Sequence, residues 1–184
     1  MVNALNKIPI SLPDVFVLEP RVFSDERGFF FESYNQRLMA DVGITESFVQ
    51  DNHSCSSRSV LRGLHYQVKH PQGKLVRVVE GEIVDVAVDL RRHSATFGRS
   101  EAVRLSGENK RMLWIPVGFA HGFRVLSERA HVLYKATDFY APEYERTLAW
   151  NDPQLKIDWQ MQGEPIISAK DLRGVAFADA EIFE

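Results

Sequence analysis

An arginine and a histidine lie three positions apart in the apolar segment Leu61–Gln67, as Arg62 and His65. The imidazole of histidine titrates near neutral pH, so His65 is a candidate for proton transfer. In a regular strand, alternation would send these two side chains to opposite faces. Gly63 between them can host a β-bulge, which would bring both side chains to one face. The alternative is a hydrogen-bonded core histidine with Arg62 as an edge charge.

A second histidine and a tyrosine, further along the chain, are also candidates for a functional site. His121 is bracketed by Gly118 and Gly122 at the mouth of a predicted strand, where loops hold functional groups on a rigid scaffold. Turn formation alone would also explain these glycines. Tyr134 lies inside an apolar strand, and its hydroxyl would need a partner or a substrate if it faced a cavity. A tyrosine that packs across strands is the simpler alternative.

Two further segments carry charged groups next to apolar sequence. Lys74 follows Gly73 and opens a predicted strand. Inside a barrel its ammonium would be an expensive charge that needs an anionic partner. At a solvated strand end, the stem of the same lysine would simply pack on apolar surface. Ser168 and Asp171 have nearly the spacing of a capping box, in which Ser168 caps a short helix and Asp171 reaches back.

The apolar residues form short alternating runs rather than helical stripes, which predicts a β protein. Strands are predicted over Val15–Glu19, Phe29–Ser33, Ser47–Gln50, Ser59–Gln67, Lys74–Glu80, Glu82–Leu90, Ser100–Ser106, Arg111–Ile115, His121–Leu126, His131–Thr137 and Thr147–Trp150. Helices are predicted over Asn35–Val42 and near Ser168–Arg173. This regular spacing, with turn residues between strands, is typical of a sandwich or closed barrel. The pattern lacks the strand–helix alternation of a doubly wound sheet.

Composition excludes several classes of protein. The 184 residues are 45% hydrophobic and carry a net charge of −3, which excludes intrinsic disorder and argues against a general nucleic-acid binder. We expect one domain over residues 1–184. No run approaches the ~20 apolar residues of a membrane helix, so we expect no membrane association. The single cysteine, Cys55, cannot form an internal disulfide, and we expect a cytoplasmic protein.

Several kinds of site are also absent from the sequence. The six histidines form no pair with metal-ligand spacing, so we expect no metal, and distant ligands are the remaining route to one. No glycine-rich phosphate loop is present, so side chains would have to hold a nucleotide. The nucleophile elbow of the α/β-hydrolases is missing too.

Six segments occur in one order along nearly the whole chain, from about Asp14 to the C-terminal helix. They are Asp25–Ser33, Phe48–Ser54, Val60–His65, Gly73–Arg77, Ile115–Phe123 and Ser168–Asp171. Together they closely resemble the dTDP-4-dehydrorhamnose 3,5-epimerases, metal-free cupins of dTDP-L-rhamnose biosynthesis. The resemblance implies an all-β, cupin-type jelly-roll barrel with short flanking helices. It also implies a homodimer, a dTDP-4-keto-6-deoxyhexose substrate and no cofactor.

The resemblance assigns roles to the matching residues. His65 would be the base, oriented by Asp171, and Tyr134 would be the acid on the opposite face of the sugar. Lys74 would stabilise the enolate oxygen. The substrate site, partly reaching across the dimer, would be lined by Arg27, Glu32, Gln50, Asp51, Asn52, Arg62, Lys74, His121, Glu145 and Lys170.

The implied reaction inverts C3 and C5 of dTDP-4-dehydro-6-deoxy-D-glucose to give dTDP-4-dehydro-L-rhamnose. Epimerisation beside a ketone removes a proton, passes through an enolate and returns a proton to the other face, so it needs no redox cofactor. One alternative is a mono-epimerase that acts on a related dTDP-4-keto sugar, and another is a metal-dependent cupin enzyme. A non-catalytic nucleotide-sugar binding module fits poorly with a lysine and a tyrosine inside a barrel.

Overall fold

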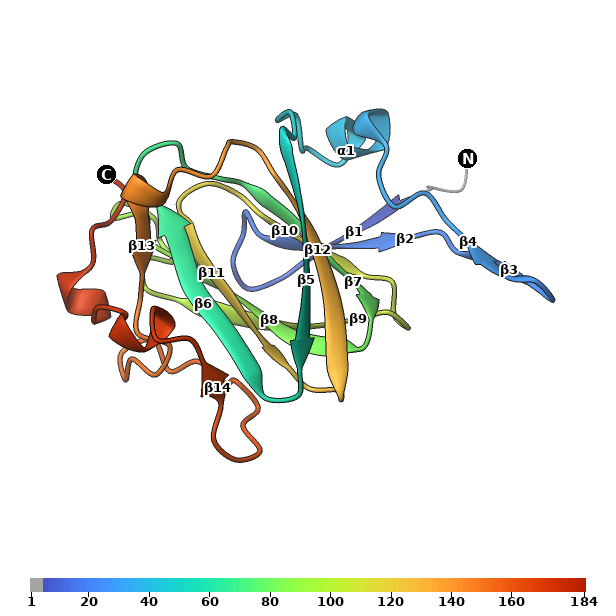
Figure 1. Cartoon of the computed structure of the whole chain (residues 1–184). Helices are drawn as coiled ribbons and strands as arrows, with labels where there is room; N and C mark the ends of the chain where they lie inside the picture. Colours follow the sequence, from blue (N-terminus) through green and yellow to red (C-terminus); the bar gives the residue numbers. More distant parts are fainter. Residues whose placement is uncertain (1–4) are drawn as a thin grey trace.

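Two antiparallel β-sheets face each other in the computed structural model, which describes residues 5–184 (Figure 1). The first sheet has the order β1 (Leu5–Pro9), β2 (Phe16–Pro20), β10 (Met112–Ile115), β7 (Lys74–Glu80), β12 (Arg129–Ala136) and β5 (Gln50–Ser57). The second has the order β13 (Glu145–Thr147), β6 (Val60–Gln67), β11 (Phe119–Val125), β8 (Glu82–Asp89) and β9 (Ser100–Ser106). The short strand β14 (Ile166–Ile167) adds a parallel pairing to β6. The predicted all-β jelly-roll architecture is therefore confirmed, whereas residues 1–4 of the predicted domain lie outside the described part.

A two-stranded arm and a few short helices flank these sheets. The arm consists of β3 (Phe23–Asp25) and β4 (Gly28–Phe30), and it projects away from the barrel in Figure 1. The helix α1 (Gln36–Asp41) follows it, and the Asn35 side chain caps α1 by accepting hydrogen bonds from two backbone N–H groups. Three 3₁₀ helices are η1 (Pro142–Tyr144), η2 (Asp171–Arg173) and η3 (Phe177–Asp179). Within residues 5–184, no helix is long and apolar enough to cross a membrane.

Three apolar clusters hold the sheets and their coverings together. The central cluster lies between the sheets, and each fully buried aliphatic side chain contributes about 1.5–3 kcal/mol. Met39 of α1 packs on the outer face of the first sheet, against Phe16, Leu75 and Trp114. On the outer face of the second sheet, Trp159 of the C-terminal segment closes another cluster. The central cluster includes Val76, Val78, Ile83, Leu105, Leu113, Phe123 and Val132.

The predicted β-bulge in β6 is present. Arg62 pairs with Phe123 and His65 pairs with His121, so two residues of β6 stand opposite one residue of β11. The flanking Leu61, Leu64 and Tyr66 all belong to the outer cluster. The register therefore slips between Arg62 and His65, and both side chains point towards the space between the sheets.

Three predicted strands differ from the observed ones. The strand predicted over Phe29–Ser33 is observed as β4, which begins at Gly28 and ends at Phe30. The strand predicted over Ser47–Gln50 instead begins at Gln50 and continues to Ser57. Because β5 is an edge strand with an exposed outer face, its sequence is polar and lacks the apolar alternation of a buried strand. The last predicted strand, Thr147–Trp150, is observed earlier in the chain as β13 (Glu145–Thr147).

Replacing Gly63 with alanine should destabilise the protein severely. A Cβ atom at Gly63 would lie 2.6 Å from the Cα of Gly122 and 2.6 Å from the carbonyl oxygen of His121, both of which are backbone atoms. The residue also has a φ of +109°, which alanine adopts only with strain. We expect a loss of about 3 kcal/mol or more in the free energy of unfolding, measured by urea denaturation.

Gly163→Ala is the matched control. Gly163 also has a positive φ of +92°, but nothing lies within 4 Å of the added Cβ atom. This variant should lose only about 1 kcal/mol, the usual penalty for alanine in this backbone region. Equal losses for the two variants would show that the close approach of β6 and β11 is not what requires glycine.

Candidate active site

A histidine–carboxylate pair lies at the inner face of β6. The Nε2–H of His65 donates to Oδ1 of Asp171 over 2.7 Å, and Oδ2 of Asp171 accepts from the backbone N–H of Gly63 at 3.3 Å. Burial alone would raise the pKa of Asp171, but these hydrogen bonds outweigh burial and hold the pKa below its usual value. Because Nε2 carries the donated proton, the free lone pair of the neutral imidazole is on Nδ1.

Asp171 reaches this position through a turn at the C-terminal segment. Its backbone N–H donates to Oγ of Ser168, as the capping-box interpretation predicted. The carboxylate does not reach back to the helix start, however, and that part of the interpretation is wrong. The side chain turns to His65 instead, because the imidazole and the N–H of Gly63 supply two donors at once.

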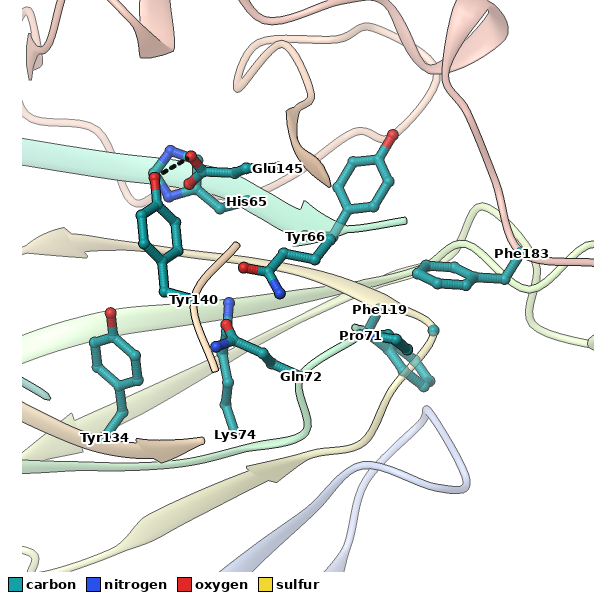
Figure 2. A pocket seen from close by; sticks show the side chains of 12 residues that line it. His65, Tyr66, Pro71, Gln72, Lys74, Phe119, Tyr134, Tyr140, Glu145 and Phe183 are labelled. Carbon is teal, nitrogen blue, oxygen red and sulfur yellow. Dashed lines mark hydrogen bonds between the residues drawn. The ribbon is translucent and has the colours of Figure 1, made fainter. Parts of the chain in front are cut away.

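Lys74 faces the pair from the opposite sheet. It opens β7, is 9% exposed, and its side chain points towards His65 and Tyr140 in Figure 2. Burial lowers the pKa of Lys74 to about 8, although the carboxylates of Glu145 and Asp85 oppose this shift. The lysine is thus a buried cation at neutral pH, held in place by nearby negative charge, and not the solvated strand end of the simpler alternative.

Tyr134 stands beside Lys74, on β12 of the first sheet (Figure 2). Burial raises the pKa of Tyr134, the Glu145 carboxylate raises it further, and Arg62 partly opposes both. The phenol therefore stays protonated well above neutral pH. Arg62 itself donates from Nε to Oγ of Ser56 at 3.0 Å, which directs the guanidinium across to β5.

A second network closes one side of the cavity. The Tyr140 hydroxyl donates to Oε2 of Glu145 at 2.8 Å, and the Lys170 ammonium pairs with the same carboxylate. Burial would raise the pKa of Glu145, but the hydrogen bonds from Lys170 and Tyr140 lower it overall. Gln50 supports this arrangement, because its side-chain oxygen accepts from the backbone N–H of Tyr140 at 2.9 Å. The side-chain nitrogen of Gln50 donates to Asn52 at 3.0 Å.

His121 forms a second histidine–carboxylate pair deeper in the barrel. It stands opposite His65 on β11, and its Nε2–H donates to Oδ1 of Asp85 at 2.7 Å. Burial lowers the pKa of His121, and the Asp85 carboxylate offsets this only in part. Asp85 is fully buried, and its other oxygen has no hydrogen-bond partner in residues 5–184. This unpaired oxygen leaves negative charge that helps to hold Lys74.

The structure brings most of the predicted site residues together, with three exceptions. Arg27 lies on the arm, where it pairs with Asp25 and is 85% exposed on its side chain. Glu32 accepts a hydrogen bond from Asn35, next to α1. Asp51 points to the outer face of β5, because strand alternation separates it from its neighbours Gln50 and Asn52, and it pairs there with Lys135. Within one chain, these three do not join the cavity around His65.

Sequence reasoning missed two members of the site. Asp85 is the one charged residue in the apolar strand segment Ile83–Val88, and a carboxylate in such a run signals a buried partner. Tyr140 lies in the connection between β12 and η1, which has no periodicity that could have singled it out. The cavity measures about 70 Å³ and is lined by His65, Tyr66, Gln67, Pro71, Gln72, Lys74, Gly118, Phe119, Tyr134, Tyr140, Glu145 and Phe183 (Figure 2).

This arrangement suits proton transfer next to a developing negative charge. His65 offers a nitrogen lone pair whose ring orientation is fixed by a carboxylate. Lys74 supplies a fixed, buried cation, which stabilises an oxyanion more than water does because its charge is already in place. Tyr134 supplies a protonated hydroxyl from the opposite sheet. A base, an oxyanion stabiliser and an acid therefore surround one small space.

Comparisons with known proteins agree with this arrangement. The profile of a family described as dTDP-4-dehydrorhamnose 3,5-epimerase matches residues 9–179. The chain is 64% identical over 175 residues to a dTDP-4-dehydrorhamnose 3,5-epimerase from Pseudomonas aeruginosa, covering 95% of this chain and 97% of that relative. It also resembles a dTDP-6-deoxy-D-glucose-3,5-epimerase from Legionella pneumophila, solved in complex with dTDP-4-keto-L-rhamnose. For that structure the TM-score is 0.94 and the identity 49%, covering 96% of this chain and 95% of that one.

A more distant solved structure has a different described activity. It is a 3′-monoepimerase from Streptomyces bikiniensis in complex with dTDP-quinovose. The TM-score is 0.86 and the sequence identity 31%, and the match covers 93% of this chain and 87% of that chain. One fold thus accommodates both double and single inversion among the proteins to which this chain is similar.

Replacing Asp85 with asparagine should lower the pKa of Lys74 below its value of about 8. The substitution keeps the shape of the side chain but removes a negative charge that favours the ammonium form. We expect the alkaline titration of the Lys74 side chain, followed by NMR, to move to lower pH. Asp51→Asn, which neutralises a carboxylate on the outer face of β5, should leave this titration unchanged. An unchanged or higher pKa in Asp85→Asn would contradict this electrostatic coupling.

Proposed function

The chain belongs to the dTDP-4-dehydrorhamnose 3,5-epimerase family and is an isomerase, and from this premise we propose which of its residues transfer the protons. The substrate is dTDP-4-dehydro-6-deoxy-D-glucose, and the reaction inverts C3 and C5 to give dTDP-4-dehydro-L-rhamnose. One observation carries the proposal. His65 and Tyr134 extend from opposing sheets into one cavity that also holds the buried ammonium of Lys74 (Figure 2).

His65 is the proposed base. Its Nδ1 lone pair takes the proton from the carbon beside the ketone, and the electrons of the broken C–H bond form the enolate. The Asp171 carboxylate fixes the ring and stabilises the imidazolium that results. A positioned base of this kind typically increases the reaction rate by about 10²–10⁴-fold. The reaction changes no oxidation state, so it requires no redox partner.

Lys74 and Tyr134 are the proposed stabiliser and acid. The ammonium of Lys74 faces the enolate oxygen, where its charge is already oriented before the reaction starts. Tyr134 then gives a proton to the carbon from the face opposite His65. Its raised pKa supports this role, because a phenol that stays neutral has a proton to donate. The lowered pKa of Lys74 limits the pH range of the proposed activity. The ammonium is present below about pH 8 and is lost above it.

Side chains around the opening are proposed to hold the rest of the substrate. A cavity of about 70 Å³ has room for only two or three waters, at about 30 Å³ each, so it suits the reacting end of the sugar. Arg62 and Lys170 would bind the diphosphate through charge-assisted hydrogen bonds. The Nδ2 group of Asn52 is a buried donor with no partner in residues 5–184, which leaves it free for a substrate oxygen. Glu145 lines the cavity itself, whereas Gln50 and His121 would support the site from behind this lining, through Tyr140 and Asp85.

We propose a homodimer in which the arm of one chain completes the site of the other. Phe29 and Phe30 are 59% and 68% exposed on this arm, an unfavourable state for aromatic side chains in water. The arm extends away from the barrel of its own chain (Figure 1), so its Arg27 and the nearby Glu32 are placed to reach a second subunit. Asp51, on the outer face of β5, would act at the same interface.

Two broader proposals accompany this function. We propose that the chain works as one domain, because the central cluster draws on both sheets. We also propose a cytoplasmic location, consistent with the exposed free thiol of Cys55, which a reducing compartment keeps unoxidised.

Incubation with dTDP-4-dehydro-6-deoxy-D-glucose in heavy water should place solvent deuterium at both C3 and C5, as followed by proton NMR. His65→Asn should slow this exchange by about 10²-fold or more, because asparagine keeps a polar side chain at this position but cannot act as the base. Tyr134→Phe should retain exchange but form less inverted product, since a proton would no longer arrive from the opposite face.

Each outcome of this experiment has a defined meaning. Deuterium at one carbon only would identify a mono-epimerase on the same fold. Wild-type exchange in His65→Asn would remove His65 from the role of base, and an unchanged product profile in Tyr134→Phe would remove Tyr134 from the role of acid. His93→Asn, which changes a histidine that is 81% exposed on its side chain, should behave like the wild type.

Mixed dimers test whether the arm acts on the partner subunit. Arg27→Ala chains and His65→Asn chains, each weakly active alone, should recover about a quarter of wild-type activity when randomly mixed. The reason is that half of the dimers are mixed, and each of these contains one site with both functional residues. If Arg27 served its own chain, every site would lack one residue and mixing would restore nothing.

A further inference from the structure

Three arginines surround a second cavity at the end of the barrel remote from β13. Arg58 lies in the turn between β5 and β6, which Figure 1 shows at the opposite end of β6 from its pairing with β13. Arg104 lies on β9 and Arg124 on β11. The cavity measures about 230 Å³, and its other lining residues are Ser59, Glu82, Leu126, Gln160 and Gln162.

Among residues 5–184, the buried cation of Arg124 has no carboxylate partner. It is 2% exposed and points away from the catalytic cavity, because it alternates with the inward-facing Phe123 and Val125. Its Nη1 group donates to the backbone carbonyls of Trp159 and Gln160, at 3.2 and 2.6 Å. Its Nε donor has no partner in the described chain. A guanidinium withdrawn from water in this way is costly unless an anion compensates it.

The surrounding charges leave the cavity positive. Arg104 pairs with Glu82 at 3.5 Å and also donates to the side-chain oxygen of Gln160. Arg58 donates to the backbone carbonyl of Leu126 at 3.0 Å and, within residues 5–184, forms no ion pair with a carboxylate. Three guanidinium groups and one carboxylate therefore line the cavity, which gives a local charge of 3 − 1 = +2.

We propose that this cavity binds the phosphate group of a small molecule, between Arg124 and Arg58. Guanidinium groups present parallel N–H donors that match the oxygens of a phosphate, and Arg124 has a buried Nε donor still to satisfy. The volume admits a phosphate group with several ordered waters, at about 30 Å³ for each water. Because Arg124 lies on the outer face of β11, this site is separated by the sheet from the cavity around His65.

The site is linked to the catalytic cavity through the chain. Arg124 holds the carbonyls of Trp159 and Gln160, and the same segment continues into β14 and then to Asp171. A phosphate bound to Arg124 would therefore sit against the segment that carries the partner of His65. Binding there would stabilise the docked form of this segment, since a ligand that binds only the folded state stabilises it.

The Nε–H cross peak of Arg124 in a ¹H–¹⁵N NMR spectrum tests the proposal, with inorganic phosphate as the probe. We expect this peak to shift saturably with phosphate and to stay in place when sodium chloride is added to the same ionic strength. Arg58→Gln should weaken phosphate binding at this peak by about tenfold or more, because one charge-assisted contact is lost. Arg129→Gln, which breaks an exposed ion pair with Glu80 elsewhere, should leave the binding unchanged.

Four results would overturn the proposal. The first is an Arg124 peak, identified through its loss in Arg124→Gln, that does not move with phosphate. The second is a peak that moves equally with chloride, which would show an effect of ionic strength alone. Binding as tight in Arg58→Gln as in the wild type would show that the arginines do not form one site. Phosphate that shifts only resonances around His65 belongs to the catalytic cavity and counts against the second site.

Discussion

The site depends on the close approach of two glycines, Gly63 on β6 and Gly122 on β11. A Cβ atom on either would lie 2.6 Å from backbone atoms of the other strand, so only glycine lets the two strands meet here. The bulge that results has two effects on the pair formed by His65 and Asp171. It turns His65 to the inner face, and it leaves the N–H of Gly63 free to donate to Asp171. One irregularity of the backbone thus presents the proposed base and anchors its carboxylate.

Charge balance inside the barrel follows from this placement. Lys74 is a buried cation, and its pKa is lowered because burial disfavours the charged form of the side chain. Asp85 and Glu145 partly compensate it from two sides, and each of these carboxylates is also held by a second group. The fold therefore gives up stability to keep a buried ammonium beside the cavity, where its fixed charge acts strongly on an oxyanion.

The sequence predicted the elements that bury apolar side chains better than the positions of polar ones. The strands from Val60 to Glu80 followed from alternation, and the bulge followed from Gly63 between Arg62 and His65. Polar edge strands carry no such signal, which is why most of β5 was missed. The pairing of Asp85 with His121 joins strands whose contact depends on the sheet order, and a single sequence does not fix that order. The resemblance to a family supplied residue roles that spacing alone left open.

His65 and Asp171 are separated by 106 positions in the chain, yet they form one hydrogen-bonded pair. During synthesis on the ribosome, both sheets of the barrel, apart from β13 and β14, are complete in sequence by Ala136. The imidazole would then already have its place on β6 but would lack its carboxylate. A nascent chain interrupted before Asp171 would therefore lack the carboxylate partner of His65. The proposed base therefore gains its orienting carboxylate only after the strands that position it have been synthesised.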